Sequence, residues 1–145
     1  MMKSDPVLDH LLGYRLKRVA IATDQEARGV LEPFGVTPAR LTTLLLVRTN
    51  PGCDQTALGR ALSINRSSAM KLVNVLSERG LIERRPGRDA RTNALYLTQE
   101  GGARLDEMVA AIERSDQALA DRLTADEQAE LARLLDKLVS QTTGD

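Results

Sequence analysis

Arginine side chains are concentrated in one short stretch of the sequence, "RRPGRDAR", which surrounds a predicted turn. The basic residues are Arg84, Arg85, Arg88 and Arg91. Guanidinium groups bind phosphate oxygens and pair with guanine, so the cluster indicates contact with a polyanion. Arg84 and Arg85 are expected to face its phosphates. Asp89 lies two residues before Arg91, where its carboxylate can orient a guanidinium by a charge-assisted hydrogen bond. A charged hairpin can equally be an ordinary solvated turn, so the cluster alone does not decide the function.

A second polar cluster precedes the arginines, in the stretch "INRSSAMKLV". Its members are Asn65, Arg66, Ser67, Ser68, Met70 and Lys71. Arginine can pair with guanine, asparagine with adenine, and serine with a base or a phosphate, while methionine can pack on a thymine methyl group. These residues can read a major groove only if they lie at the start of a helix, because a helix presents its N-terminal residues to the base edges.

The charge of the chain is unevenly distributed, although basic and acidic residues balance at 20 each. Residues 60–91 contain eight basic and three acidic residues, a net charge of +5. Residues 99–145 contain five basic and eleven acidic residues, a net charge of −6. A basic centre and an acidic end predict that a polyanion meets one face only.

The elements that must position these clusters can be predicted from periodicity and capping signals. Asp5-Pro6 predicts the start of a long amphipathic helix within residues 5–34, ended by Gly35. Thr37-Pro38 repeats the start signal before a helix near residues 39–49.

A helix-turn-helix is predicted next. Asp54 can cap a short third helix, and the fourth helix, called the recognition helix below, is expected at about 66–78. Gly59 is small where the two helices approach, Ser63 is small in the turn, and Gly80 suits a left-handed helix end. The β-forming runs "LIERR" and "NALYL" flank turn residues, which predicts a hairpin, or wing, at about 81–97. Residues 37–98 therefore read as a winged helix-turn-helix lobe.

Two further helices are expected over residues 99–141. Thr98 can cap the first, and Thr124 with Glu127 forms a capping box for the second. The first and last helices of the chain both carry wide leucine faces, and a small winged lobe could hardly cover both. We therefore predict that residues 5–34 and 99–141 form a helical dimerisation region across a two-fold axis. The alternative is that both faces pack within one chain.

Composition narrows the classes of function. One cysteine and one histidine cannot complete a zinc site, and the single cysteine excludes an intrachain disulfide, so we expect no metal, no cofactor and a cytoplasmic location. We find no catalytic constellation with supporting context and predict that the protein is not an enzyme. Cys53 follows Pro51-Gly52 without a basic neighbour, which favours an incidental thiol, and Asp54 is expected to raise its pKa.

The segment "LGRALSINRSSAMKLVNVLSERGLIERRPGRDARTNALYLTQEG" resembles the MarR family of winged-helix transcription regulators. The similarity is strongest at "GLI" (80–82), at "DAR" (89–91) and at "LTQEG" (97–101), and its order of elements extends over residues 1–145. The resemblance implies a mainly α-helical homodimer with a small β-hairpin wing, whose terminal helices intertwine and which binds a pseudo-palindromic duplex. It places Arg66, Ser67, Ser68 and Lys71 in the recognition helix, and Asp89 and Arg91 in the wing motif.

The resemblance also implies release of DNA by a small molecule bound between the helical region and the winged lobe. "LDHLLGYRLKR" is similar to members that sense aromatic acids or their coenzyme A thioesters. His10, Tyr14 and Arg18 are four apart on the predicted first helix, and Arg40 lies near the start of the second. Histidine and tyrosine can hydrogen-bond a phenol, and arginine can hold a carboxylate or phosphate. The same stripe could instead belong to the dimer interface.

These signals together predict a ligand-responsive DNA-binding regulator, which we expect to repress a catabolic or stress operon. The alternative is a winged-helix module that binds another protein and not DNA. The basic wing favours the first prediction, since an interaction module has no need of Arg88 and Arg91.

Overall fold

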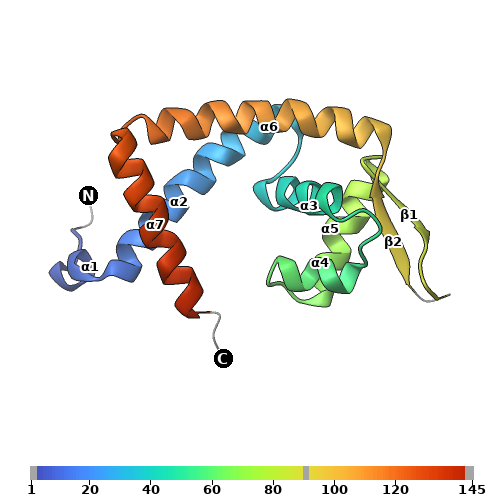
Figure 1. Cartoon of the computed structure of the whole chain (residues 1–145), viewed down its shortest axis with the longest axis horizontal. Coiled ribbons are helices and arrows are strands. Elements are labelled where there is room, and N and C mark those ends of the chain that lie inside the picture. The colour runs from blue at the N-terminus through green and yellow to red at the C-terminus, as the bar shows by residue number, and fades with distance from the viewer. Residues whose placement is uncertain (1–2, 90–91, 143–145) are drawn as a thin grey trace. The chain divides into compact units, whose positions relative to one another are not determined.

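The chain folds mainly into α-helices with one two-stranded antiparallel hairpin (Figure 1), which confirms the predicted fold class. The computed structural model describes residues 3–89 and 92–142. The elements in chain order are α1 (Pro6–His10), α2 (Leu12–Leu31), the 3-10 helix η1 (Glu32–Phe34), α3 (Pro38–Thr49), α4 (Gln55–Ala61), α5 (Arg66–Glu78), β1 (Ile82–Pro86), β2 (Asn93–Leu97), α6 (Gln99–Ala120) and α7 (Ala125–Thr142). One compact unit extends to Ile112 and a second begins at Glu113.

The N-terminal helix differs from the prediction, because it is interrupted. Leu11 is extended, with φ −77° and ψ 117°, so α1 ends at His10 and α2 starts at Leu12. The break leaves the carbonyl of Asp9 outside a helical ladder, and Arg15 Nε donates to it at 2.9 Å. The expectation of one continuous helix was therefore wrong.

The predicted helix starts are confirmed by side-chain caps. The side chain of Asp5 accepts from Val7 N at 2.8 Å, and that of Thr37 accepts from Arg40 N at 3.3 Å. The side chain of Asp54 accepts from Ala57 N at 2.7 Å. Thr98 Oγ1 accepts from Gly101 N at 2.9 Å. Thr124 and Glu127 form the capping box, with Glu127 N donating to Thr124 Oγ1 at 3.2 Å and Thr124 N donating to Glu127 Oε2 at 2.9 Å. Each cap satisfies N–H groups that a helix start would otherwise leave without a partner.

The helix-turn-helix is formed by α4 and α5, and α5 has the predicted bounds. A Cβ at Gly59 would lie 3.4 Å from Ala69 Cβ, so the two helices approach closely at this residue, as predicted. Ser63 turns the chain with a left-handed φ of 54°. At the end of α5, Gly80 has φ 71°, and Leu81 N donates to Leu76 O at 2.9 Å, a Schellman-type helix end.

Both strands of the hairpin pack against helices of the winged lobe, β1 against α5 and β2 against α3. Its register pairs Ile82 with Leu97 and Arg84 with Leu95. Cys53 forms an isolated antiparallel bridge to Leu95 on the other edge of β2. Ile82 and Leu95 are both buried, so the base of the hairpin belongs to the core while its tip extends beyond it.

The core lies in the first unit and is aliphatic, as the scarcity of aromatic residues predicted. Its fully buried side chains include Leu31, Leu44, Val47, Val73, Leu76, Ile82, Leu95, Leu105 and Met108. α3 packs against α5 and β2, so the recognition helix and the wing share one support.

The second unit contains the end of α6 and α7. The side chains of residues 125–140 are all exposed except that of Gln128, which is half-buried. Leu131, Leu134 and Leu135 are 44%, 42% and 39% exposed. The apolar face that the sequence predicts for this helix is therefore present but uncovered within the chain.

Within the described residues, no single helix combines the length and apolarity needed to cross a bilayer. Leu12–Phe34 and Pro38–Thr49 meet that criterion only when taken together, across a bend of 75°.

Candidate nucleic-acid interface

The first two turns of α5 present most of the predicted DNA-reading side chains to solvent. Ala69, Val73 and Leu76 face the core, which leaves the opposite face of the helix free. Asn65, Arg66, Ser67, Met70 and Lys71 are exposed, whereas Ser68 is half-buried. Met70 is 46% exposed, so its apolar side chain is accessible on this face of the helix.

Asn65 has a local role that the sequence interpretation did not assign. Its side-chain oxygen accepts from Ser68 N at 2.8 Å, so Asn65 is the N-cap of α5. The cap uses one of the two lone pairs of this oxygen and fixes the direction of the side chain. A bidentate contact of Asn65 to adenine would therefore have to share Oδ1 with the cap.

Arg84 and Arg85 were expected to face phosphates together, and the hairpin separates them. Side chains of a strand alternate between its two faces. Arg84 lies on the face of Leu95 and donates to Asn74 Oδ1 on α5. Arg85 lies on the other face, where Nε donates to Glu83 Oε1 at 2.8 Å and the guanidinium stacks 4.2 Å from the ring centre of Tyr96. Only Arg84 is thus directed toward the recognition helix.

The tip of the wing is closed by its own hydrogen bonds. Asp89 Oδ1 accepts from both the backbone N and the Oγ1 of Thr92, each at 3.0 Å, and Gly87 N donates to Thr92 O at 2.8 Å. Arg88 and Asp89 are exposed. Arg91 lies outside the described residues, so its pairing with Asp89 stays a prediction.

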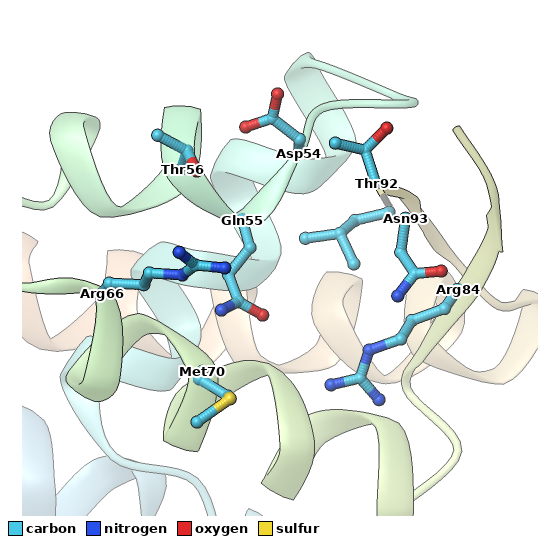
Figure 2. Close-up of a pocket in the computed structure, with 9 residues that line it drawn as sticks. Asp54, Gln55, Thr56, Arg66, Met70, Arg84, Thr92 and Asn93 are labelled. Carbon is cyan, nitrogen blue, oxygen red and sulfur yellow. The ribbon is translucent and has the colours of Figure 1, made fainter. Parts of the chain in front are cut away.

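A cleft of about 230 Å³ lies between the start of α4, the recognition helix and the wing (Figure 2). Arg66 and Met70 line it from α5 and Arg84 from β1. The remaining lining residues are Asp54, Gln55, Thr56, Thr92, Asn93 and Leu95. The cleft brings two guanidinium groups and one exposed apolar side chain from separate elements to one surface, which suits a ligand with both phosphates and base edges.

The sequence interpretation missed Gln55, Thr56, Asn74, Thr92 and Asn93. The strict alternation of β1 could have indicated that Arg84 and Arg85 diverge. The position of Asp54 as a cap could have indicated that Gln55 and Thr56 begin a helix beside the recognition helix. Nothing in the local pattern indicated that Asn74 meets Arg84, since that contact depends on how the hairpin packs.

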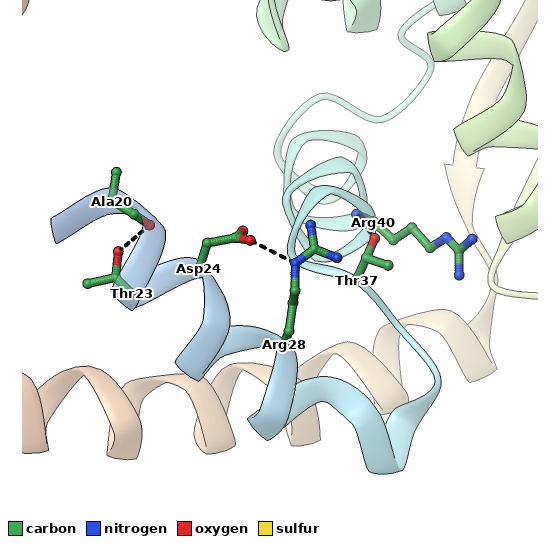
Figure 3. Close-up of polar contacts among 6 residues, drawn as sticks. All are labelled: Ala20, Thr23, Asp24, Arg28, Thr37 and Arg40. Atoms are coloured by element: carbon green, nitrogen blue, oxygen red, sulfur yellow. Dashed lines mark hydrogen bonds and ion pairs between the residues drawn. The ribbon is translucent and has the colours of Figure 1, made fainter. Parts of the chain in front are cut away.

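The four predicted effector residues are not gathered into one site. His10 belongs to α1 whereas Tyr14 and Arg18 belong to α2, so the break at Leu11 interrupts their predicted common stripe. Arg40 is half-buried near the start of α3, and its side chain extends away from α2 in Figure 3.

On α2, Arg28 is paired with Asp24 at 2.7 Å. Arg28 lines a shallow cavity of about 370 Å³ with Gly29, Glu32, Gly35, Val36 and Thr37, and none of the four predicted residues lines it.

Cys53 is half-buried at its bridge to Leu95. Burial raises the pKa of its thiol, and the neighbouring carboxylate of Asp54 raises it further, because both disfavour the thiolate. The predicted influence of Asp54 is confirmed, although burial is the larger cause. This environment is the reverse of the electropositive surroundings that activate a cysteine.

Comparisons of sequence and of structure with known proteins both find transcriptional regulators. A family model described as "MarR family" matches residues 34–92. A Thauera aromatica protein assigned to the regulation of the hcr operon is 38% identical over 132 residues, covering 90% of this chain and 80% of the relative. The transcriptional repressor CouR bound to a 23-mer DNA duplex has a TM-score of 0.89 at 30% identity, covering 96% of this chain and 99% of CouR.

Two ligand-bound structures are also similar. CouR bound to p-coumaroyl-CoA has a TM-score of 0.85 at 29% identity, covering 95% of this chain and 98% of CouR. The Mycobacterium tuberculosis protein Rv2887 in complex with salicylic acid has a TM-score of 0.72 at 29% identity, covering 88% of this chain and 96% of Rv2887.

Proposed function

The chain belongs to the MarR family of transcriptional regulators, and from this premise we propose that it is a homodimeric, sequence-specific DNA-binding repressor released by a small-molecule effector. The observation that carries the proposal is the cleft between α5 and the wing, where Arg66, Met70 and Arg84 converge. The cleft places an exposed methionine beside two arginines. It matches a major groove, where a thymine methyl group lies among phosphates and guanine edges.

The recognition helix and the wing divide the proposed contacts between them. Arg66, Ser67, Met70 and Lys71 read base edges or the adjacent phosphates from the start of α5. Arg84 contacts a phosphate from the side of the cleft. Arg88, Asp89 and Arg91 belong to the wing tip, which we assign to the minor groove, where the negative potential is enhanced. Asn65, Ser68 and Arg85 have smaller roles, since the first caps α5, the second is half-buried and the third is paired with Glu83.

Dimerisation is supported by the apolar side chains that the chain leaves uncovered. α7 exposes Leu131, Leu134 and Leu135, and α2 exposes Leu12 and Val19, each by 59%. Contiguous apolar surface of this kind marks an interaction site. A two-fold dimer would cover it with a second copy of itself and would present two recognition helices about one helical turn of DNA apart.

The effector class is proposed from two relatives. CouR is bound to p-coumaroyl-CoA and Rv2887 to salicylic acid, both of which carry an aromatic ring and an acyl or carboxyl group. We propose an aromatic acid or its coenzyme A thioester for this chain. His10, Tyr14, Arg18 and Arg40 stay the proposed contacts, although the structure of one subunit does not gather them. A regulator of this kind acts where the DNA is, so we infer a cytoplasmic location and no catalytic activity.

Selection of a binding site from a random duplex library tests DNA recognition. The purified protein should enrich a pseudo-palindromic sequence, and its affinity for that operator should fall steeply as the salt concentration rises. Failure to enrich any sequence at low salt, together with a stable dimer, would favour the alternative of a winged-helix module that binds another protein.

Thermal shift tests the effector. Salicylate and p-coumaroyl-CoA are added separately, and the one that binds should raise the melting temperature and release the operator in a fluorescence anisotropy titration. No shift and no release with either compound would contradict the proposed effector class and leave DNA recognition unaffected.

A further inference from the structure

Arg79 lies directly after the recognition helix and connects its end to a distant part of the chain. Its guanidinium donates to two consecutive carbonyls, through Nη2 to Phe34 O at 2.7 Å and through Nη1 to Gly35 O. Both carbonyls belong to the connection between α2 and α3. The side chain of Arg79 is exposed, so this contact is separate from the aliphatic core. It joins the C-terminal end of α5 to the C-terminal end of α2 and η1.

The contact has a clear electrostatic basis. The last carbonyls of a helix carry partial negative charge, so a cation is stabilised there. Both oxygens lie at the end of η1, and the planar fork of the guanidinium reaches them at once. Gly35 has φ 64°, and a Cβ at this position would lie 3.1 Å from Arg79 Nη2. Leu31 and Val36, on either side of the connection, are buried, which anchors the carbonyls that Arg79 holds.

A second attachment at the same helix end is built differently. Thr98 Oγ1 donates to Gly80 O at 2.5 Å, and Thr98 N donates to Leu81 O at 3.1 Å, which ties this end to the start of α6. A Cβ at Gly101 would lie 2.0 Å from Leu81 O, so the approach tolerates no side chain. This attachment cannot be changed without disturbing the packing. The Arg79 contact can be removed by itself.

We propose that Arg79 is a positioning residue that holds the recognition helix at a fixed orientation to α2, so that displacement of α2 reaches the DNA-reading surface through this contact. α2 carries part of the apolar surface assigned above to the partner subunit, together with Tyr14 and Arg18. The inference rests on the proposed function, because it requires that α5 reads DNA.

Operator affinity of Arg79→Ala is the direct test, with the operator selected by the wild-type protein. We expect affinity to fall roughly 5–20-fold, the range of a modest coupling between two sites. Affinity for an unrelated duplex should stay within about twofold, and the salt dependence should not change, because the guanidinium of Arg79 is engaged with Phe34 O and Gly35 O and is assigned no phosphate. Arg79→Lys keeps the charge but not the fork, so it should stay weakened.

Arg48 provides a matched control. It is also an exposed arginine that joins two elements, since Nη1 donates to Asp106 at 3.2 Å, but the element joined to α3 is α6 and not α5. Arg48→Ala should leave operator affinity unchanged. If Arg79→Ala also leaves it unchanged, or if it lowers affinity for all duplexes equally with a shallower salt dependence, the proposal is wrong. If Arg79→Ala does not fold, Arg79→Lys decides by the same criteria.

A double-mutant cycle with Gly35→Ala tests transmission and needs no effector. The added methyl group strains the left-handed backbone and presses on Arg79, at a site remote from the cleft residues. We expect Gly35→Ala to lower operator affinity in the wild-type background and to change it by less than about twofold when Arg79 is already alanine. If Gly35→Ala lowers operator affinity by the same factor in the wild-type protein and in Arg79→Ala, the proposal is wrong. A wild-type protein that binds no duplex would instead refute the proposed function.

Discussion

α3 and α7 have similar apolar periodicity in the sequence, yet the structure treats them in opposite ways. The twelve residues of α3 bury Leu41, Thr43, Leu44 and Val47 against the rest of the winged lobe. The eighteen residues of α7 bury none of the side chains described for that helix. Apolar periodicity thus shows that a face of a helix is to be covered, but it does not show whether the cover comes from the same chain. The first face belongs to the core, and the second is the face that we propose as the dimer interface.

Charge differs between the same two parts of the molecule. The basic residues of α5 and the hairpin lie on the surface of the lobe that contains α3, whereas the segment that ends in α7 is acidic. Like charges on α7 and on DNA would repel, so α7 is unsuited to contact the duplex. This difference in charge supports our proposal that the winged lobe binds DNA and that α7 binds the partner subunit.

The largest expected effect comes from the covered face. Leu44→Ala removes a fully buried side chain and leaves a cavity in the lobe, so we expect the free energy of unfolding to fall by about 3–4 kcal/mol. Urea denaturation measures this loss, which should be the same at every protein concentration. A loss below about 1 kcal/mol would mean that α3 is not the centre of the core.

Substitutions on the exposed apolar face of α7 should weaken dimerisation. Leu131→Glu combined with Leu135→Glu places two charges in the proposed interface, and we expect dimer dissociation to become easier by about 2–4 kcal/mol. Sedimentation equilibrium measures the dissociation constant. Ala129→Glu, on the opposite side of α7, is the control and should leave it unchanged. A wild-type protein that sediments as a monomer would refute the dimer.

Within the winged lobe, two arginines of the cleft should differ in kind. Arg66→Ala should weaken operator binding by about 1–3 kcal/mol and relax the choice of base at one position in each half-site. Arg84→Ala should weaken binding to all duplexes alike and reduce the salt dependence, as expected for a phosphate contact. Repeating the site selection with each variant measures both effects. Equal loss on all sequences for Arg66→Ala would reassign it to a phosphate.

Removing the N-cap of α5 or of α7 should have smaller effects, which should differ between the two helices. Asn65→Ala removes the cap of α5 and Thr124→Ala removes the cap of α7, each at about 1 kcal/mol. Because α5 belongs to the core and α7 does not, the first should lower the free energy of unfolding, whereas the second should mainly raise the dimer dissociation constant. The same pair of measurements, denaturation and sedimentation, separates them. Identical behaviour of both variants would remove the distinction between core and interface.

Cys53 should give the smallest effect. Because its pKa is raised, its thiol should react with iodoacetamide more slowly than free cysteine at neutral pH, and half-maximal reactivity should lie above the ordinary thiol pKa. A raised pKa in the folded state also means that this contribution to stability is present below the unfolded pKa and is lost as the pH rises through that of the folded protein. Cys53→Ala should leave operator affinity within about twofold. Rapid alkylation at pH 7 would contradict the interpretation of Cys53 as an incidental thiol.

Local features of the fold could be predicted from the sequence because their causes lie within a few residues. The caps at Asp5, Thr37, Asp54 and Thr98 depend on a side chain and an N–H group two or three positions away. The bounds of α5, the left-handed Gly80 and the two strands follow from the same short-range rules. The break at Leu11 escaped prediction, because no proline or glycine occupies that position and the extended backbone leaves the apolar pattern unaltered.

The amino-acid sequence by itself determined the order of helices, the hairpin, the basic segment and the apolar faces, since each depends on residue type and spacing. Only the tertiary structure decided which arginine of the wing faces the recognition helix, that Asn74 meets Arg84, and that Arg79 holds the connection after α2. The physical reason is that these contacts join segments between ten and forty-five residues apart. Their geometry is set by how the elements pack on the shared core, and no local pattern of residues encodes it.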